Sequence, residues 1–403
     1  MHTPDLATAD CAGDFVDLVS SQVWGERIGE LARVTNAGSR LARTLTQRHA
    51  IEISLERMRR RGRNTPPTEL ELLLGRLACE ITAMSATLTE AGRERLRTAI
   101  AAALDGEATL VGLFHLASVA SRQRHRGFEI DYSGFDEASP FDLMLRRDGV
   151  EAELVTDVVS AEDGRDVRRG AWVQLVDRVD PDLQTWLADH PGRYLLKMTL
   201  PQGLREQACA QGADPLALLH GRIRAMLHTQ CRGDHDEAAV LRLDPLMLAG
   251  SQADELGLMN RLRREFGHEA HLAVTASGGG VFVMAARAAR EDEVAGAIRR
   301  RMSALAPTRL TGTRPGILAM LIEDTDRLEW RHLRDRMVLE GEARQFLTHP
   351  EARRVVAVTC ASRLELFGLA GPDVVADGEL RFRNPQHPAS KLAALAPAVA
   401  SSV

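Results

Sequence analysis

Apolar residues recur at helical spacing through the first hundred residues of the chain. Within residues 15–34 they stand three and four positions apart, which predicts an amphipathic helix with one apolar face. Further along, Thr68 and Glu71 have the spacing of a capping box and predict the start of another helix. We therefore expect a helical N-terminal region over residues 1–105, whose apolar stripe must be buried against another surface.

The pattern changes after this region, because short apolar runs now alternate with helical segments. The expected helices and strands of this part are, in chain order, a helix at 109–124, strands at 128–132, 141–145 and 150–159, a helix at 165–179 and a strand at 192–200. This order is typical of an α/β protein and predicts a mixed sheet flanked by helices. We expect residues 106–200 to form this core.

Helical and strand-like segments also alternate over residues 201–388. They predict a further α/β region, which either forms a second domain or extends the core sheet. Its last strands are expected near 317–322, 355–359 and 379–382. The final segment, 389–403, is rich in Ala, Pro and Ser, and we expect a disordered tail there.

Charge and lysine content restrict the chemistry available to the chain. A net charge of −5 gives no overall basic field, so any nucleic-acid contact needs a local patch. Among the 51 basic residues only Lys197 and Lys391 are lysines. Arginine neither deprotonates nor replaces lysine in catalysis, so a Walker-type phosphate loop and a Schiff-base lysine are nearly excluded.

Cysteine usage and hydropathy bear on the expected compartment. The five cysteines are scattered and form no CxxC pair, which argues against a zinc knuckle or a disulfide framework. The first 14 residues are acidic and lack an apolar core, so we expect no signal peptide. No apolar run approaches the length of a membrane span. These observations favour a cytoplasmic protein without a membrane partner.

The residues that point to a specific chemistry lie in and around the second and third expected core strands. Asp142 follows Ser139-Pro140-Phe141 at the start of one strand, and the next strand covers Glu151 to Ser160. Asp163-Gly164-Arg165 and Arg168-Arg169 come directly afterwards. This stretch resembles a group of bacterial proteins with a PD-(D/E)XK, restriction-endonuclease-like nuclease core. The resemblance implies a nuclease fold in which carboxylates from two adjacent strands hold Mg²⁺ and a lysine orients the attacking water.

The chain departs from the pattern of that group at the positions that do the chemistry. With Ser160 as the anchor, the glutamate of the E-x-K motif falls at Val155 and the lysine at Asp157. His115 stands where the preceding helix often carries a glutamate. Valine cannot bind magnesium and aspartate reverses the charge of lysine, so Asp142 is the one expected site residue retained. These departures predict a decayed active site.

A rebuilt site is the alternative. Because strand residues alternate between faces, Glu153 and Asp157 share one face, and with Asp142 they would form an acidic site for Mg²⁺. Lys197 lies on the next expected strand, where it is either a donated catalytic lysine or an ordinary strand lysine.

Two groups of arginines are candidates for contact with nucleic-acid phosphates. They are Arg57, Arg59, Arg60, Arg61 and Arg63 in the N-terminal region, and Arg165, Arg168 and Arg169 after the motif. The alternatives are a solvated helix end for the first group and ion pairs with Asp163 or Asp166 for the second.

Three functional hypotheses follow. The first is a nuclease-like protein with a decayed site that serves as a DNA-binding or assembly component in DNA processing or defence. The second is an active Mg²⁺-dependent DNA nuclease with the rearranged acidic site. The third is a non-enzymatic interaction or scaffold protein that uses its N-terminal helices to bind a partner or a second copy of itself.

Overall fold

A computed structural model describes residues 5–36, 38–61, 66–205, 214–246, 262–263, 266–267, 270–363 and 378–402. The chain divides into two compact units. The first unit consists of Met1–Asn36, Leu45–Ala161 and Ala295–Val403, and the second consists of Ala37–Thr44 and Glu162–Val294. The second unit is therefore mainly an insertion between two segments of the first.

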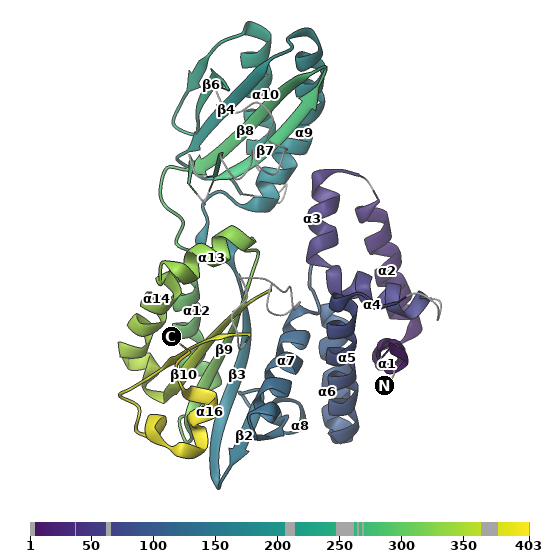
Figure 1. Ribbon diagram of the computed structural model, residues 1–403, viewed down its shortest axis with the longest axis vertical. Coiled ribbons are helices and arrows are strands. Elements are labelled where there is room, and N and C mark those ends of the chain that lie inside the picture. The colour runs from purple at the N-terminus through teal and green to yellow at the C-terminus, as the bar shows by residue number, and fades with distance from the viewer. Residues whose placement is uncertain are drawn as a thin grey trace. The chain divides into compact units, whose positions relative to one another are not determined.

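The first unit is built on a six-stranded mixed sheet with the strand order β1-β2-β3-β9-β10-β11 (Figure 1). The strands are β1 (Glu129–Asp131), β2 (Leu143–Arg147), β3 (Val150–Ser160), β9 (Gly316–Glu323), β10 (Val355–Ser362) and β11 (Leu380–Arg383). Strands β1, β2 and β3 form an antiparallel meander, whereas β3, β9 and β10 are parallel to one another. Strand β11 closes the sheet antiparallel to β10.

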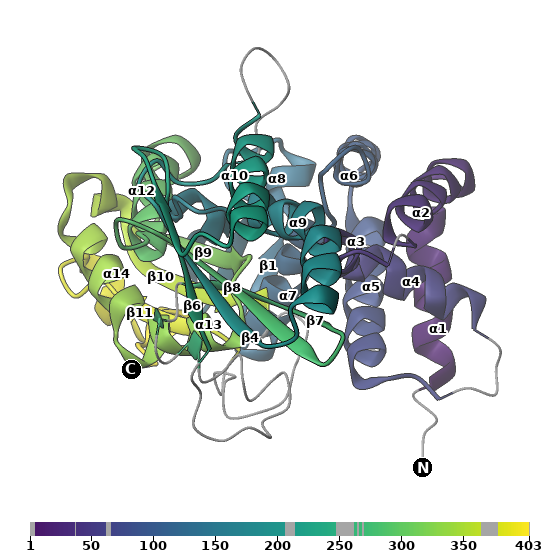
Figure 2. The same cartoon turned by 90° about the horizontal axis from the view of Figure 1, so that it is seen from above.

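Helices of the first unit cover both faces of this sheet. One group precedes β1 and comprises α1 (Asp5–Asp17), α2 (Ser21–Thr35), the end of α3 (Arg40–Arg48), α4 (Ala50–Arg60), α5 (Glu69–Thr87), α6 (Glu90–Ala103) and α7 (Val111–His125). The short helix α8 (Ser133–Asp136) follows β1, and the other group comprises α12 (Val294–Arg309), α13 (Arg327–Asp335) and α14 (Val338–Thr348). Both views place α7 between the sheet and α5, with α14 on the opposite face (Figures 1 and 2).

Local sequence explains where these helices begin and what they bury. The predicted capping box at α5 is present, since the Thr68 hydroxyl accepts from the backbone of Glu71 and the Glu71 carboxylate accepts from the backbone of Thr68. The apolar faces of α1, α5 and α7 meet the sheet residues Ala152 and Leu154 in one hydrophobic core. The single helix predicted over residues 15–34 is wrong, because α1 ends at Asp17 and α2 begins at Ser21. Of its predicted apolar stripe, Phe15 and Leu31 are buried, whereas Val23 and Val34 are exposed.

The second unit has its own five-stranded sheet with the order β5-β6-β4-β8-β7. Its strands are β4 (Arg193–Leu200), β5 (Gly233–His235), β6 (Val240–Pro245), β7 (His271–Ser277) and β8 (Gly280–Ala288). Two long helices, α9 (Arg169–Asp189) and α10 (Pro215–Thr229), pack on this sheet through a second hydrophobic core. Apolar residues of α9 that stand three or four apart, such as Trp172, Leu175 and Val179, supply this contact.

The α/β class is confirmed, but the boundaries predicted from the sequence differ from those of the structure. The helix and strand expected at 165–179 and 192–200 are α9 and β4 of the second unit, so the core does not extend through residue 200. The expected region 201–388 is divided as well. Its first part completes the second sheet, and β9, β10 and β11 extend the first.

The prediction of a disordered tail at 389–403 is wrong for the residues described. They form two short 3₁₀ turns and the helix α16 (Ala396–Val399). Leu395, Ala398 and Val399 are buried in the core of the first unit. Ser402 exchanges hydrogen bonds with the backbone of Arg381 on the edge strand β11. A composition rich in Ala and Pro is therefore not a reliable sign of disorder here, because this segment packs on the core and covers the edge strand β11.

Cysteine pairing also differs from the expectation. Cys11 of α1 and Cys79 of α5 form a disulfide. In the part of the chain that the structure describes, Cys231 and Cys360 are free, and Cys209 lies outside that part. Within the same residues, no helix combines the length and the apolar character needed to span a membrane.

Candidate functional site

Asp142 stands immediately before β2, as the sequence predicts. Its carboxylate accepts hydrogen bonds from the backbone N–H (2.7 Å) and the hydroxyl (3.1 Å) of Thr156 on β3. Arg309, the last residue of α12, forms an ion pair with the other carboxylate oxygen at 2.8 Å. Burial raises the pKa of Asp142, while Arg309 and Thr156 act in the opposite direction. A cavity of about 270 Å³ lies here, lined by Gly134, Phe135, Ser139, Pro140, Asp142 and Arg309.

The other two predicted carboxylates have partners of their own. Glu153 is fully buried and accepts hydrogen bonds from the backbone N–H of Thr311 (2.8 Å) and from its hydroxyl. Asp157 forms a two-pronged ion pair with Arg301 of α12, at 2.5 and 3.0 Å. Val155 lies between them and is fully buried.

These contacts agree with the prediction that Glu153 and Asp157 lie on one face of β3. Their partners, Thr311 and Arg301, come from α12 and the segment that follows it. Within the described ranges, however, no group of three His, Cys, Asp or Glu side chains is placed to hold a metal ion. Binding of Mg²⁺ at Asp142 or Asp157 would have to displace an arginine.

Lys197 does not join these carboxylates. It lies on β4 in the sheet of the second unit, where its ammonium is 3.4 Å from Asp244 and 5.1 Å from the ring centre of Phe266. The strand beside β3 is β9 instead, and it sets Met320 opposite Asp157. The prediction that Lys197 lies on the strand next to the motif is therefore wrong, and its contacts are those of an ordinary strand lysine.

His115, the residue at the position of the expected glutamate, faces the sheet from α7. Its Nε2 donates a hydrogen bond to the carbonyl oxygen of Ala319 on β9 at 3.0 Å. Burial lowers the pKa of His115 to about 4, although the hydrogen bond to Ala319 acts against this shift. The imidazole is therefore neutral at physiological pH and does not supply the negative charge of the expected glutamate. Its hydrogen bond joins α7 to β9.

The arginines predicted to contact phosphates at the end of α4 are paired with buried glutamates. Arg57 and Arg61 bind Glu71 at 2.7 and 2.5 Å. Arg59 binds Glu56 at 2.8 Å, and Arg60 binds the same carboxylate. Arg63 lies outside the described residues. Burial opposes ionisation of Glu56 and Glu71, but hydrogen bonds outweigh it and lower the pKa of each carboxyl to about 2. Glu56 accepts them from Arg59, Trp24 and Arg60, and Glu71 accepts them from Thr68, Arg61 and Arg57.

In the second group of arginines, Arg165 pairs through its side chain, whereas Arg168 and Arg169 make hydrogen bonds through their backbones. Arg165 is buried and pairs with Glu162 and with Asp292, the latter at 3.9 Å. Glu162 also accepts from the backbone N–H of Arg169 at 2.6 Å. Arg168 precedes the first turn of α9 and donates its backbone N–H to Leu204. The ion pairs predicted for Arg165 thus exist, but with Glu162 and Asp292 instead of Asp163 or Asp166.

A wider groove of about 820 Å³ lies at the turn between β2 and β3. Its charged side chains bind one another, since Glu151 accepts from Arg146 at 2.9 Å and from Arg314 at 2.5 Å. Each of these three side chains is at least a third exposed. Exposed pairs of this kind contribute little stability. The lining of the groove holds equal numbers of arginines and acidic residues, so it has no excess charge for an anionic ligand; they are Arg146, Arg147, Arg314, Glu129, Asp148 and Glu151.

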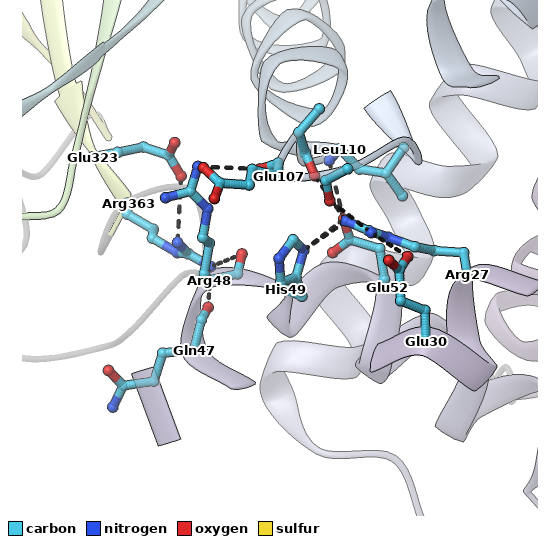
Figure 3. Close-up of polar contacts among 12 residues, drawn as sticks. Arg27, Glu30, Gln47, Arg48, His49, Glu52, Glu107, Leu110, Glu323 and Arg363 are labelled. Atoms are coloured by element: carbon cyan, nitrogen blue, oxygen red, sulfur yellow. Dashed lines mark hydrogen bonds and ion pairs between the residues drawn. The ribbon is translucent and has the colours of Figure 1, made fainter. Parts of the chain in front are cut away.

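A group of charged residues that the sequence analysis did not single out lies where β9 and β10 end. We call Arg48, His49, Glu52, Glu323 and Arg363 the strand-end cluster (Figure 3). Glu323 is the last residue of β9, and Arg363 follows β10 directly. Their side chains form an ion pair at 3.3 Å, and each is only 16% exposed. Figure 3 shows the Arg363 guanidinium between Glu323 and the end of α3, where it donates to the carbonyl oxygens of Gln47 and Arg48.

Burial dominates the electrostatics of the strand-end cluster. It raises the pKa of Glu323 to about 7, even though the positive charges of Arg363 and Arg48 oppose the shift. The negative charges of Asp324 and Glu52 reinforce it. A carboxyl that exchanges its proton near neutrality is uncommon, and such groups concentrate at functional sites.

Glu52 and His49 connect this cluster to the start of α7. Glu52 is fully buried, accepts from the backbone N–H of Leu110 at 3.3 Å and lies 3.5 Å from His49. Arg27 of α2 contacts the same His49 nitrogen and donates to the carbonyl oxygens of Gly106 and Ala108. The cluster therefore joins α2, α3 and α4 to the ends of two central strands.

One signal in the sequence could have revealed this cluster. Charged residues come directly after two apolar runs, with Glu323 and Asp324 after the first and Arg363 after the second. Parallel strands end at the same edge of a sheet, and polar groups at that edge are favoured positions for a site. The contribution of α4, by contrast, comes from more than 250 positions earlier in the chain and has no local signal.

Comparison with known proteins identifies no family model, no curated protein and no solved structure similar to this chain. No relative therefore assigns a role to any of these residues. Their contacts, burial and charge are the basis for the function proposed below.

Proposed function

We propose that this chain is a restriction-endonuclease-like protein that does not hydrolyse DNA and acts as a non-catalytic component of a protein assembly. The observation that carries the proposal is the separate pairing of the three acidic residues in the motif region. Asp142 is held by Thr156 and Arg309, Glu153 by Thr311, and Asp157 by Arg301. An arginine close to a carboxylate provides the positive charge that a metal ion would otherwise provide.

The architecture supports the nuclease-like part of this proposal. The antiparallel pair β2 and β3 sets Asp142 at the start of one strand and the E-x-K positions, Val155 and Asp157, on the next. Helix α12 then leads into β9, which is parallel to β3. These placements support the resemblance to a nuclease core, into which the second unit is inserted between β3 and α12.

The contacts of the arginines favour a role in assembly over one in DNA binding. The four described arginines at the end of α4 share two buried glutamates, and Arg165 is itself buried. Pairing with Glu56, Glu71 and Glu162 reduces the positive charge that phosphate binding requires. The inserted second unit has its own sheet and core, which gives the chain a separate module for contacts with other molecules.

A nuclease assay on the full chain tests the proposal. Supercoiled plasmid and linear duplex DNA are incubated with the protein and Mg²⁺ or Mn²⁺, beside the Asp142→Ala variant. We expect no cleavage above background in any sample. Cleavage by the wild type that Asp142→Ala abolishes would overturn the proposal and establish the metal-dependent nuclease.

Fluorescence anisotropy with a labelled duplex at low ionic strength tests the absence of DNA binding. We expect no saturable binding that weakens with added salt. Binding that weakens on substitution of Arg57 and Arg60 by alanine, but not of the matched exposed Arg344, would contradict the assembly role and favour a DNA-binding component. Arg344 is a suitable control because, like Arg60, it is exposed and pairs with a glutamate four residues earlier in its own helix, Glu340.

A further inference from the structure

The disulfide between Cys11 and Cys79 joins two helices that are distant in sequence. The two residues are 68 positions apart, and their Cα atoms are separated by 5.0 Å. Both side chains are partly exposed, so a small thiol reagent can approach them. The free cysteines among the described residues, Cys231 and Cys360, lie elsewhere and form no second bridge.

Helix α1 covers part of the core of the first unit. Its residues Ala12, Phe15 and Val16 are buried. The Phe15 ring lies edge-on to Phe114 of α7, with 5.6 Å between ring centres, and edge-on to Trp24 at 6.3 Å. Helix α7 packs directly on the sheet, so the position of α1 affects Phe114 and other core side chains near the sheet.

Helix α1 is short, and among its residues 11–17 the buried side chains are Ala12, Phe15 and Val16. It has 13 residues, and isolated helices of this length are marginal in water. A covalent bond from Cys11 to the middle of the long helix α5 adds a restraint that does not depend on burial. Because the two cysteines are 68 positions apart, the disulfide also reduces the conformational entropy of the state in which α1 is detached.

We infer that the Cys11–Cys79 disulfide is a redox-responsive latch that fixes α1 on α5 when oxidised and allows α1 to detach when reduced. Reduction by an external dithiol breaks the sulfur–sulfur bond. Two electrons and two protons pass to the cystine, which becomes two thiols, and the dithiol becomes a disulfide. Partial exposure of both cysteines permits the attack of the reagent thiolate on sulfur.

Alkylation of the full chain tests whether the bridge forms. The protein is equilibrated with glutathione disulfide or with dithiothreitol, treated with iodoacetamide and digested for mass spectrometry. We expect Cys11 and Cys79 to be protected in the oxidised sample and alkylated in the reduced one. Exposed Cys231 should react in the reduced sample irrespective of the latch. Full alkylation of Cys11 and Cys79 after oxidation would refute the inference.

Pulse proteolysis tests whether the bridge acts as a latch. We expect thermolysin to cut within α1 at least about tenfold faster in the reduced protein than in the oxidised protein, because the bridge restricts the detached helix. The Cys11→Ser/Cys79→Ser variant should be cut at the fast rate under both conditions, and Cys231→Ser should respond like the wild type. Equal cleavage rates of oxidised and reduced wild type would overturn the latch, and this comparison needs no variant to fold.

Discussion

Replacement of Glu323 by glutamine removes the ionisable group at the end of β9 and keeps its size. The pKa of the Glu323 carboxyl is raised from 4.5 to about 7 in the folded protein. Between these two values the folded chain holds a proton that the unfolded chain releases, so the stability of the wild type falls as pH rises through this window. At about 1.4 kcal/mol per pH unit, this one group costs about 3 kcal/mol above pH 7.

The Glu323→Gln variant should not bear this cost. The free energy of unfolding of the variant minus that of the wild type should therefore increase by about 3 kcal/mol from pH 4.5 to pH 7. This difference should stay constant above pH 7. Neutral glutamine still offers an oxygen to Arg363, which retains its hydrogen bonds to the end of α3.

Denaturant unfolding at several pH values measures this difference. Tryptophan fluorescence reports on the first unit alone in a Trp172→Phe/Trp186→Phe background, because both of these residues belong to the second unit. Glu94→Gln is the matched control, since Glu94 is exposed on α6 and its side chain is 69% accessible. If the difference in free energy of unfolding between Glu323→Gln and the wild type is the same at every pH, the raised pKa of Glu323 is refuted.

Two further substitutions and one deletion test other parts of the fold. Glu71→Ala removes the capping box and leaves Arg57 and Arg61 without their partner, so thermal or chemical unfolding should show a loss of about 3 kcal/mol at pH 7. In the wild type this stabilisation should disappear as pH falls from 4.5 to 2, because the pKa of Glu71 is lowered to about 2. Gly134→Ala places a methyl group 3.0 Å from the Cα of Asp142 and should cost about 1 to 3 kcal/mol, whereas Gly106→Ala meets no atom within 4 Å and reports only the strain of its positive φ. Deletion of residues 397–403 removes the buried Ala398 and Val399 and should destabilise the first unit by about 2 to 4 kcal/mol in the same assay, whereas a dispensable tail would leave it unchanged.

Local patterns in the sequence predict individual elements well. The alternation over residues 150–159 corresponds to β3, and the capping box at Thr68 begins α5. Both depend on neighbouring residues, which is why the pattern suffices. The placement of Asp142 before β2 and of Glu153 and Asp157 on one face of β3 follows from the same local rules.

The partners of these site residues were not predictable in this way. Asp142 and Asp157 bind Arg309 and Arg301, which lie more than 140 positions later in the chain. The order of the sequence predicts that Lys197 lies on the strand beside the motif, because β4 is the next strand along the chain, yet β9 occupies that place. Sequence distance misled the assignment because an entire unit intervenes between β3 and its neighbour.

Contacts near Gly164 explain how the second unit can be inserted without separating β3 from α12. The carbonyl oxygen of Gly164 accepts a hydrogen bond from the backbone N–H of Glu293 at 2.7 Å. A Cβ atom at Gly164 would lie 2.5 Å from the backbone of Val294, so a residue without a side chain is required where the two segments meet. The chain thus enters and leaves the insertion at adjacent points, and α12 can begin close to where β3 ends. This closure brings Arg301 and Arg309 of α12 within reach of Asp157 and Asp142, and it therefore makes their ion pairs possible.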